Sequence, residues 1–215
     1  MPTPPSLESS LTREEQSLIR EFTTPARIQT YLDSIPYSPD DFYRCPLRVL
    51  RDHKAHCFDG ALFAAAMLRR IGYPPRILEM LPNARDDDHL LAVYKLDGCW
   101  GAVAKSNFSG LRYREPVYRT LRELITSYFE QFYNIEREKT LRGYGLPMNL
   151  TKYDPIGWEI RDEPLDRIAD DLDKQRHFRL LTPGQETQLA LLDERSASAG
   201  LGGAVDAGLW KPGKH

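Results

Sequence analysis

The chain has 215 residues, which fits one domain with a full hydrophobic core. Its formal net charge is −2 and its acidic and basic residues are interspersed, so no basic field indicates a nucleic-acid partner. No apolar run approaches the roughly 20 residues that span a membrane. The first residues, Met1–Ser6, lack the charged and apolar regions of a signal peptide. We therefore expect neither a nucleic-acid partner nor a membrane partner.

The cysteines are Cys45, Cys57 and Cys99, an odd number without the spacing of a disulfide framework. Because no export signal precedes them, a reduced cytoplasmic compartment is expected. Neither a CxxC pair nor a paired-histidine spacing indicates a metal site. We expect the protein to need no metal and no cofactor.

The N-terminal part of the chain predicts three helices. Residues 1–10 are rich in proline and serine, which indicates a loose tail. Thr12 begins a capping-box pattern, so a helix is expected over 12–22. A proline at the first helical position and apolar residues on one face predict a second helix over 25–35. A short helix over 46–52 leads toward the next motif.

Cys57 stands at the start of a predicted buried helix over 58–71. A short apolar strand is expected over 76–81, and His89 opens a second strand. A thiol near the positive end of a helix has a stabilised thiolate, which lowers its pKa. A histidine within reach then completes a nucleophile–base pair. We therefore expect Cys57 to be the most acidic and most reactive of the three thiols.

Asp97 and Gly98 lie between two apolar runs, which is a strong hairpin signal. If these two residues form the turn, simple pairing places His89 opposite Ser106, and Asn107 lies one step beyond. Either side chain would be near the imidazole, and a bulge would decide which one faces it.

The remaining segments predict mostly helix. Apolar residues at a period of 3.6 indicate a long helix over 117–134 with a core face. A strand broken by glycines is expected within 139–150, and helices over 164–175 and 184–194. The segment 195–215 is rich in glycine and alanine and is expected to be disordered. A single domain over 11–194 results.

Three short patterns resemble the core of the transglutaminase-like superfamily, of a bacterial type. They are Cys-x-x-Gly-Ala-x-x-x-Ala-Ala-x-Leu-Arg-x-x-Gly-x-Pro-Pro (57–75), Asp-His (88–89) and Asp-Gly-x-Trp-Gly (97–101). The resemblance covers about residues 45–110. It implies an α+β fold related to papain-like cysteine proteases, with the cysteine at the N-terminus of a core helix packed on an antiparallel sheet. It also implies a Cys-His-Asp or Cys-His-Asn triad that forms an acyl-thioester.

The resemblance assigns the first two members of the triad. Cys57 would attack the amide, and His89 would activate Cys57 and later protonate the leaving amine. His53 and His56 lie closer to Cys57 in sequence. His89 is preferred because the family's histidine occupies the equivalent strand entry.

The third member departs from the family pattern. The position of the usual aspartate is Ala104, whose side chain cannot accept a hydrogen bond. We predict that Asn107 orients His89, since its segment resembles the asparagine segment of papain-like enzymes and an amide oxygen can hold an imidazole. Asp88 and Ser106 remain alternatives.

Substrate contacts are less determined. The backbone N–H of Cys57 is one expected oxyanion donor. Tyr43 and Arg44 are candidates for the second. Arg112 and Arg114 alternate along a predicted strand, which would suit a clamp for a carboxylate, or a solvated strand with acidic partners.

The sequence thus predicts thiol-dependent acyl chemistry on an amide or peptide bond, in a cysteine peptidase, amidase or acyl transferase. The expected partner is a peptide or a small amide. The alternative is an inactive transglutaminase-like binding or scaffold module. Ala104 favours that alternative, whereas Cys57 and His89 oppose it. Arylamine-type acetyl transfer is a weaker third possibility, because no feature suggests coenzyme A binding.

Overall fold

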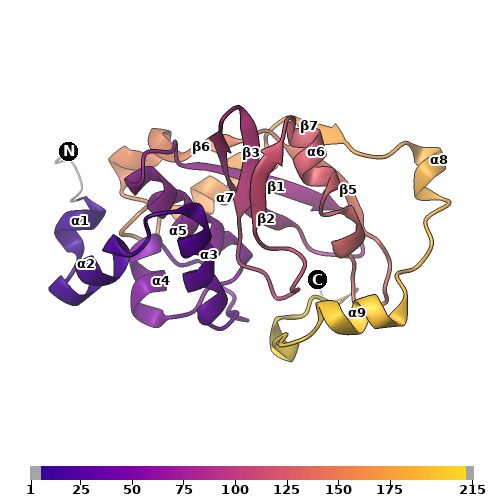
Figure 1. The fold of residues 1–215 in the computed structure, drawn as a ribbon, viewed down its shortest axis with the longest axis horizontal. Coiled ribbons are helices and arrows are strands. Elements are labelled where there is room, and N and C mark those ends of the chain that lie inside the picture. The colour runs from indigo at the N-terminus through magenta and orange to yellow at the C-terminus, as the bar shows by residue number, and fades with distance from the viewer. Residues whose placement is uncertain (1–5, 212–215) are drawn as a thin grey trace.

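A computed structural model describes residues 6–211. One seven-stranded antiparallel sheet has the strand order β4-β3-β2-β1-β5-β7, and β6 pairs with β1. Most N-terminal helices gather at one end of the sheet (Figure 1). The helices are α1 (Leu7–Ser10), α2 (Arg13–Arg20), α3 (Pro25–Ser34), α4 (Pro46–Asp52), α5 (Cys57–Arg70), α6 (Leu121–Thr126), α7 (Leu165–Asp173), α8 (Pro183–Glu186) and α9 (Glu194–Gly200), with short 3-10 turns η1 (Phe129–Gln131), η2 (Leu150–Ile156) and η3 (Asp206–Gly208). The strands are β1 (Arg76–Pro82), β2 (His89–Leu96), β3 (Cys99–Val103), β4 (Arg114–Tyr118), β5 (Leu141–Gly145), β6 (Met148–Asn149) and β7 (His177–Arg179).

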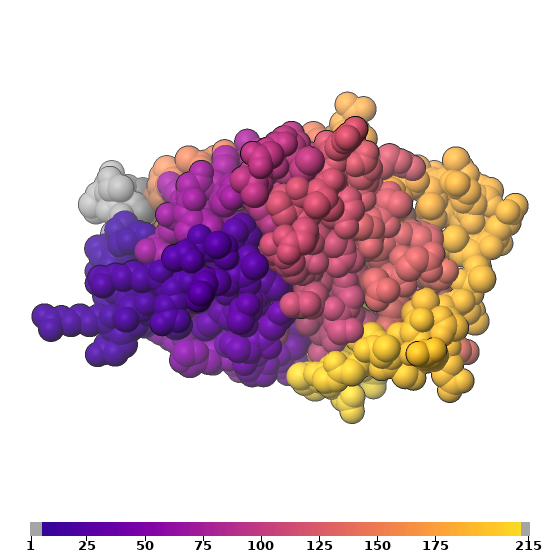
Figure 2. All heavy atoms as spheres, viewed as in Figure 1, coloured from indigo at the N-terminus to yellow at the C-terminus, as the bar shows by residue number. Residues whose placement is uncertain are grey.

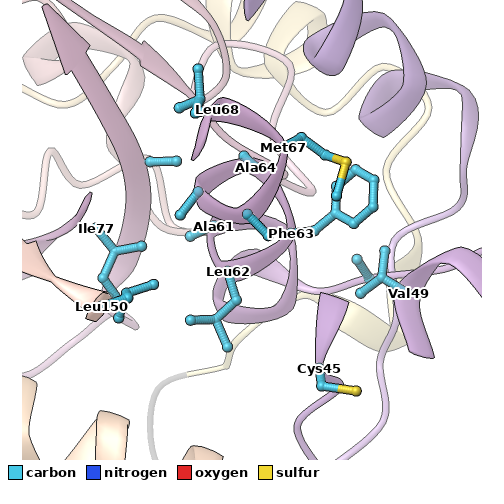
Figure 3. Close-up of a cluster of buried hydrophobic side chains, with 14 of the residues drawn as sticks. Cys45, Val49, Ala61, Leu62, Phe63, Ala64, Met67, Leu68, Ile77 and Leu150 are labelled. Carbon is cyan, nitrogen blue, oxygen red and sulfur yellow. The ribbon is translucent and has the colours of Figure 1, made fainter. Parts of the chain in front are cut away.

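Helix α5 is the centre of the core. Every residue from Cys57 to Leu68 is buried, and α5 packs on β1 and β2. Figure 3 shows side chains of α5 in one cluster with Ile77 of β1. Along β2, Leu90 and Ala92 join the cluster around α5, whereas Leu91 and Val93 join the cluster on the other face of the sheet. This alternation is what a strand buried on both faces requires. The predicted α+β fold, with the cysteine helix packed on an antiparallel sheet, is confirmed.

The N-terminal helices begin where the sequence predicts. Thr12 and Glu15 form the expected reciprocal capping box at α2. Pro25 occupies the first turn of α3, and α4 spans Pro46–Asp52. Part of the segment predicted to be loose forms the single turn α1, while residues 1–5 lie outside the described residues. No helix of the described chain is long and apolar enough to cross a membrane.

The β2–β3 hairpin has the predicted register. Leu96 pairs with Cys99 and Lys95 with Trp100. Asp97 and Gly98 have positive φ angles of 49° and 81°, the left-handed conformation that a tight hairpin turn needs.

Strand β3 ends at Val103, earlier than simple pairing assumed. The main chain of Ala104 donates to Gln29 Oε1 (3.0 Å), and its carbonyl accepts from Gln29 Nε2 (2.9 Å). Lys105 Nζ then donates to two carbonyls near the C-terminal end of α3, at 2.8 and 2.5 Å. Because α3 takes these partners, Ser106 does not pair with His89 across the hairpin.

The long helix expected over 117–134 is wrong. The chain forms β4, then α6, and the 3-10 turn η1. Thr120 caps α6 at its N-terminus, and Arg114 bonds the side chain and the carbonyl of Ser127 just beyond its C-terminus. The apolar period continues across the break, and four residues of the predicted core face are buried: Leu124, Ile125, Tyr128 and Phe132. Leu121 and Phe129 of the same face are partly buried.

The C-terminal region is more ordered than the sequence indicates. Helix α7 confirms one prediction, but the helix expected over 184–194 shrinks to α8. Helix α9 forms inside the segment expected to be disordered, and Tyr133 Oη donates to its Ala197 carbonyl (3.2 Å). Residues 212–215 of that segment lie outside the described residues.

Candidate active site around Cys57 and His89

Cys57 is the first residue of α5, and its neighbours cap the helix. His56 Nδ1 accepts from the amides of Phe58 (3.1 Å) and Asp59 (3.4 Å). The Asp59 carboxylate accepts from the His56 amide in return (3.2 Å). This reciprocal cap engages the His56 ring in the start of the helix.

Arg44 is a structural residue in this network. Its side chain is 1% exposed and forms ion pairs with Asp40, Asp52 and Asp59. Its amide also donates to Asp59 (2.8 Å). Because the guanidinium is committed to three carboxylates, the suggestion that Arg44 supplies an oxyanion donor is wrong.

His89 and Cys57 line the same pocket. His89 Nε2 lies 2.7 Å from the Leu111 carbonyl oxygen, which can only accept a hydrogen bond. Nε2 therefore carries the proton, and Nδ1 keeps a free lone pair. Burial lowers the pKa of His89 to about 4, and the hydrogen bond to Leu111 opposes this shift only in part. The ring is therefore neutral at neutral pH.

The pKa of Cys57 is raised well above its ordinary value. Burial is the largest cause, followed by the negative charges of Asp88, Asp87 and Asp59, and the Phe58 amide at the helix start opposes them. The expected lowering of the Cys57 pKa is therefore wrong for this closed site. A neutral thiol and a neutral imidazole share the pocket.

Asn107 lines this pocket, but its carboxamide has another partner. Its Nδ2 donates to the Val205 carbonyl (2.9 Å), and its Oδ1 accepts from the Val205 amide (2.8 Å). His89 is held by the Leu111 carbonyl, a main-chain group that no side-chain motif would reveal. The predicted hydrogen bond between Asn107 and His89 is therefore not formed, because Asn107 bonds Val205 and His89 bonds Leu111.

The two alternatives to Asn107 also have other partners. Ser106 Oγ accepts from the Phe108 amide (3.0 Å). Asp88 shares a hydrogen bond with Glu79. The pKa of Asp88 is raised well above its usual range, mainly by burial and next by the negative charge of Asp87.

The two arginines of the proposed clamp lie away from the pockets around Cys57. Arg112 pairs with Asp33 of α3. Arg114 bonds Ser127 and stacks on the Tyr128 ring, 3.8 Å from its centroid. Both side chains tie surface segments together, and the clamp for a carboxylate stays a prediction.

Tyr43 does lie beside the site. Its ring packs on Phe58, with 4.4 Å between centroids, and it lines a second pocket of about 210 Å³ that also reaches Cys57. The other walls of this second pocket are apolar residues of β2 and α7, the ring of His56, and four carboxylates: Glu79, Asp87, Asp88 and Asp173.

Tyr37 is a site residue that the sequence reasoning missed. It lines the Cys57 pocket, and its phenol lies next to both the amide and the thiol of Cys57. Burial is the main cause that raises the pKa of Tyr37 well above its usual value. An isolated bridge pairs Tyr37 with Ala55, two residues before Cys57, and no sequence motif marks this bridge.

Among the described residues, no group of three or more histidine, cysteine, aspartate or glutamate side chains is placed to hold a metal ion.

Comparison with known proteins gives a distant likeness. No protein-family model matches the chain, and no curated protein sequence matches it. A solved structure of Legionella pneumophila LapG is similar over 77% of this chain and 90% of that chain, with 12% identity and a TM-score of 0.39. The EGTA-treated form of Legionella pneumophila LapG is similar over 49% of this chain and 72% of that chain, with 13% identity and a TM-score of 0.35. At this distance, the residues of the chain itself must carry the functional proposal.

Proposed function

We propose that the protein carries out thiol-dependent acyl chemistry on an amide or peptide bond, as a transglutaminase-like cysteine hydrolase or transferase. One observation carries the proposal. Cys57 at a helix N-terminus and a histidine with a fixed tautomer line one pocket. A buried nucleophile and base in one concave site are the usual components of covalent catalysis.

In the first step, Cys57 Sγ attacks the amide carbonyl carbon while His89 Nδ1 takes the thiol proton. The Leu111 carbonyl supports this role because it holds the other ring nitrogen protonated, leaving Nδ1 as the acceptor. The imidazolium then donates its proton to the leaving nitrogen, and the carbon–nitrogen bond breaks. Water or an amine attacks the thioester next and releases Cys57.

The neutral state of the resting pair sets how the thiol is activated. With the pKa of Cys57 raised and the pKa of His89 lowered, the proton must move during the attack and not before it. General-base assistance of this kind contributes typically 10²–10⁴-fold. A substrate that changed the burial of both groups would also change the charge state from which this step begins.

The developing oxyanion needs hydrogen-bond donors. The Cys57 amide lies at the positive N-terminal end of α5 and is the first donor in this proposal. The Tyr37 hydroxyl lies beside the same amide and is the candidate for the second, in place of Arg44. The proposed substrate is a peptide or a small amide, and the proposed location is the cytoplasm.

A second candidate is an inactive binding module. Two observations favour it: Ala104 replaces the usual aspartate, and the Cys57 pKa is raised.

Intact-mass profiling with electrophilic peptide amide probes separates the two candidates. An enzyme should gain one probe mass on Cys57, mapped by peptide analysis, and Cys57→Ala should gain none. If no probe reacts at Cys57 while the native protein retains its fold, the binding module is the better account. Analysis of products with and without an added amine then distinguishes hydrolysis from transfer.

A further inference from the structure

The C-terminal segment, defined here as residues 201–211, lies along the candidate active site. It follows α9, whose last residue accepts a hydrogen bond from the Ser109 amide (2.9 Å from the Gly200 carbonyl). Figure 1 shows this segment below the lower ends of β1 and β2, and Figure 2 shows its atoms lying along the lower edge of the molecule against mid-chain residues. Its position brings distant residues of the chain to the Cys57 pocket.

Asn107 holds this segment by its main chain. The Asn107 carboxamide donates to the Val205 carbonyl and accepts from the Val205 amide, at 2.9 and 2.8 Å. Asn107 is 8% exposed, so both bonds form away from bulk water. A side chain that bonds both backbone groups of one residue recognises a peptide without regard to that residue's side chain.

Gly208 continues the contact toward the nucleophile. A Cβ atom at Gly208 would lie 2.8 Å from the Tyr37 ring and 3.3 Å from Asn107 Nδ2. Gly208 and Trp210 line the same pocket as Cys57 and His89. With this cover in place, Cys57 is only 8% exposed and His89 only 4% exposed.

We propose that Asn107 is a peptide main-chain subsite beside Cys57, and that residues 204–210 occupy it in this structure as an intramolecular peptide that closes the site. The inference rests on the proposed function for the identity of the competing ligand, a peptide. The bound segment also indicates which peptide sequences the subsite would prefer. A small residue three positions after the one held by Asn107 fits against Tyr37, whereas a larger one does not.

This role explains why Asn107 has no bond to His89. Leu111 already fixes the histidine, so Asn107 is free to bind a peptide. A substrate must displace the C-terminal segment, and the cost is limited because no residue of 201–211 is buried.

The test compares full-length variants by the alkylation rate of each cysteine, measured by peptide mapping with iodoacetamide. Val205→Pro removes the amide that Asn107 accepts from, and Gly208→Ala forces the segment away from Tyr37. Both should raise the rate at Cys57 by about fivefold or more, as expected for the loss of a hydrogen bond or a close fit. Gly184→Ala is the matched control, because a Cβ there meets open space.

The other cysteines report on the fold. Cys45 is 3% exposed in the core and should stay unreactive in every variant, which excludes unfolding as the cause of a faster Cys57 reaction. Unchanged Cys57 rates in both variants, with hydrogen exchange showing the segment released, would overturn the proposal.

A synthetic peptide with the sequence of residues 204–210 tests the subsite itself. It should slow Cys57 alkylation in Val205→Pro and should fail to do so when Asn107→Ala is added. Equal protection with and without Asn107 would contradict the main-chain subsite. Because alkylation needs no catalysis, these outcomes do not depend on the probe experiment. A Cys57 that is alkylated but transfers no acyl group would refute the proposed function and leave the subsite proposal standing.

Discussion

Helix α5 and the C-terminal segment both border Cys57, yet they are held in opposite ways. From Cys57 to Leu68 every residue of α5 is buried, and the helix packs on two central strands. Residues 201–211 contain no buried residue, and Asn107 forms two hydrogen bonds with the main chain of Val205. Elements with few buried contacts open at a much lower free energy than core helices.

This difference separates two functions within one site. The core fixes Cys57 and His89, the proposed nucleophile and base, and covalent chemistry requires such groups to be rigidly placed. The C-terminal segment controls access, which requires a part of the molecule that can move. Changes in α5 and β2 should therefore alter chemistry or stability, and changes in 201–211 should alter access alone.

The largest expected effect is on chemistry. Cys57→Ala should remove at least about 1,000-fold of any amide-directed activity, because the covalent step is lost. Cys99→Ala should leave activity unchanged, since Cys99 is the first residue of β3 and does not line either pocket that contains Cys57. Steady-state assays on the substrate found by probe profiling measure both, and an active Cys57→Ala protein would refute the nucleophile.

The next effect is on stability. Phe63→Ala in α5 should lower the free energy of unfolding by about 3–5 kcal/mol, because Phe63 is fully buried against Phe22 and Tyr31. Leu209→Ala in the C-terminal segment should cost less than about 1 kcal/mol, since Leu209 is only partly buried. Urea unfolding measures both, and equal losses would remove the contrast between the two regions.

The buried His89 should make stability depend on pH. Its pKa is about 4 in the fold and about 6.5 in the unfolded chain, so below pH 6.5 the unfolded chain binds a proton that the fold does not. Stability should fall by on the order of 3 kcal/mol between pH 6.5 and 4. Buried carboxyls with raised pKa values, such as Asp86, change stability in the opposite direction. The difference between wild type and His89→Gln isolates the histidine, and parallel pH curves for the two would show that His89 is not buried as a neutral ring.

A smaller effect tests how the segment 104–107 packs on α5. A Cβ at Gly60 would lie 2.2 Å from Lys105 Cβ, so Gly60→Ala should cost about 1–3 kcal/mol by overpacking. Gly184→Ala, which meets open space, should change stability little. Thermal unfolding of both variants checks the contact, and an unchanged Gly60→Ala protein would contradict the close approach of the 104–107 segment.

The sequence predicts what local patterns determine. Periodicity, capping residues and the Asp97–Gly98 turn identify α5, the hairpin and its register, and hence the positions of Cys57 and His89. These elements are fixed by residues close together in the chain, so their signals can be recognised without knowing the fold.

The rest of the site depends on contacts between distant residues. Gln29 ends β3 from 75 positions away, and Val205 takes the Asn107 carboxamide from 98 positions away. The partner of His89 is the Leu111 main-chain carbonyl, which any residue type could supply. The Cys57 pKa likewise reflects burial by the assembled fold, which outweighs the helix start.

The central claim is that Cys57 and His89 act as nucleophile and base. Its most direct test is the rate at which Cys57 is acylated by an activated peptide ester at neutral pH, followed by intact mass. The rate should fall by about 100-fold or more in His89→Ala and recover in part when imidazole is added, because the base is lost and replaced. Acylation of His89→Ala at the wild-type rate, without response to imidazole, would contradict the account.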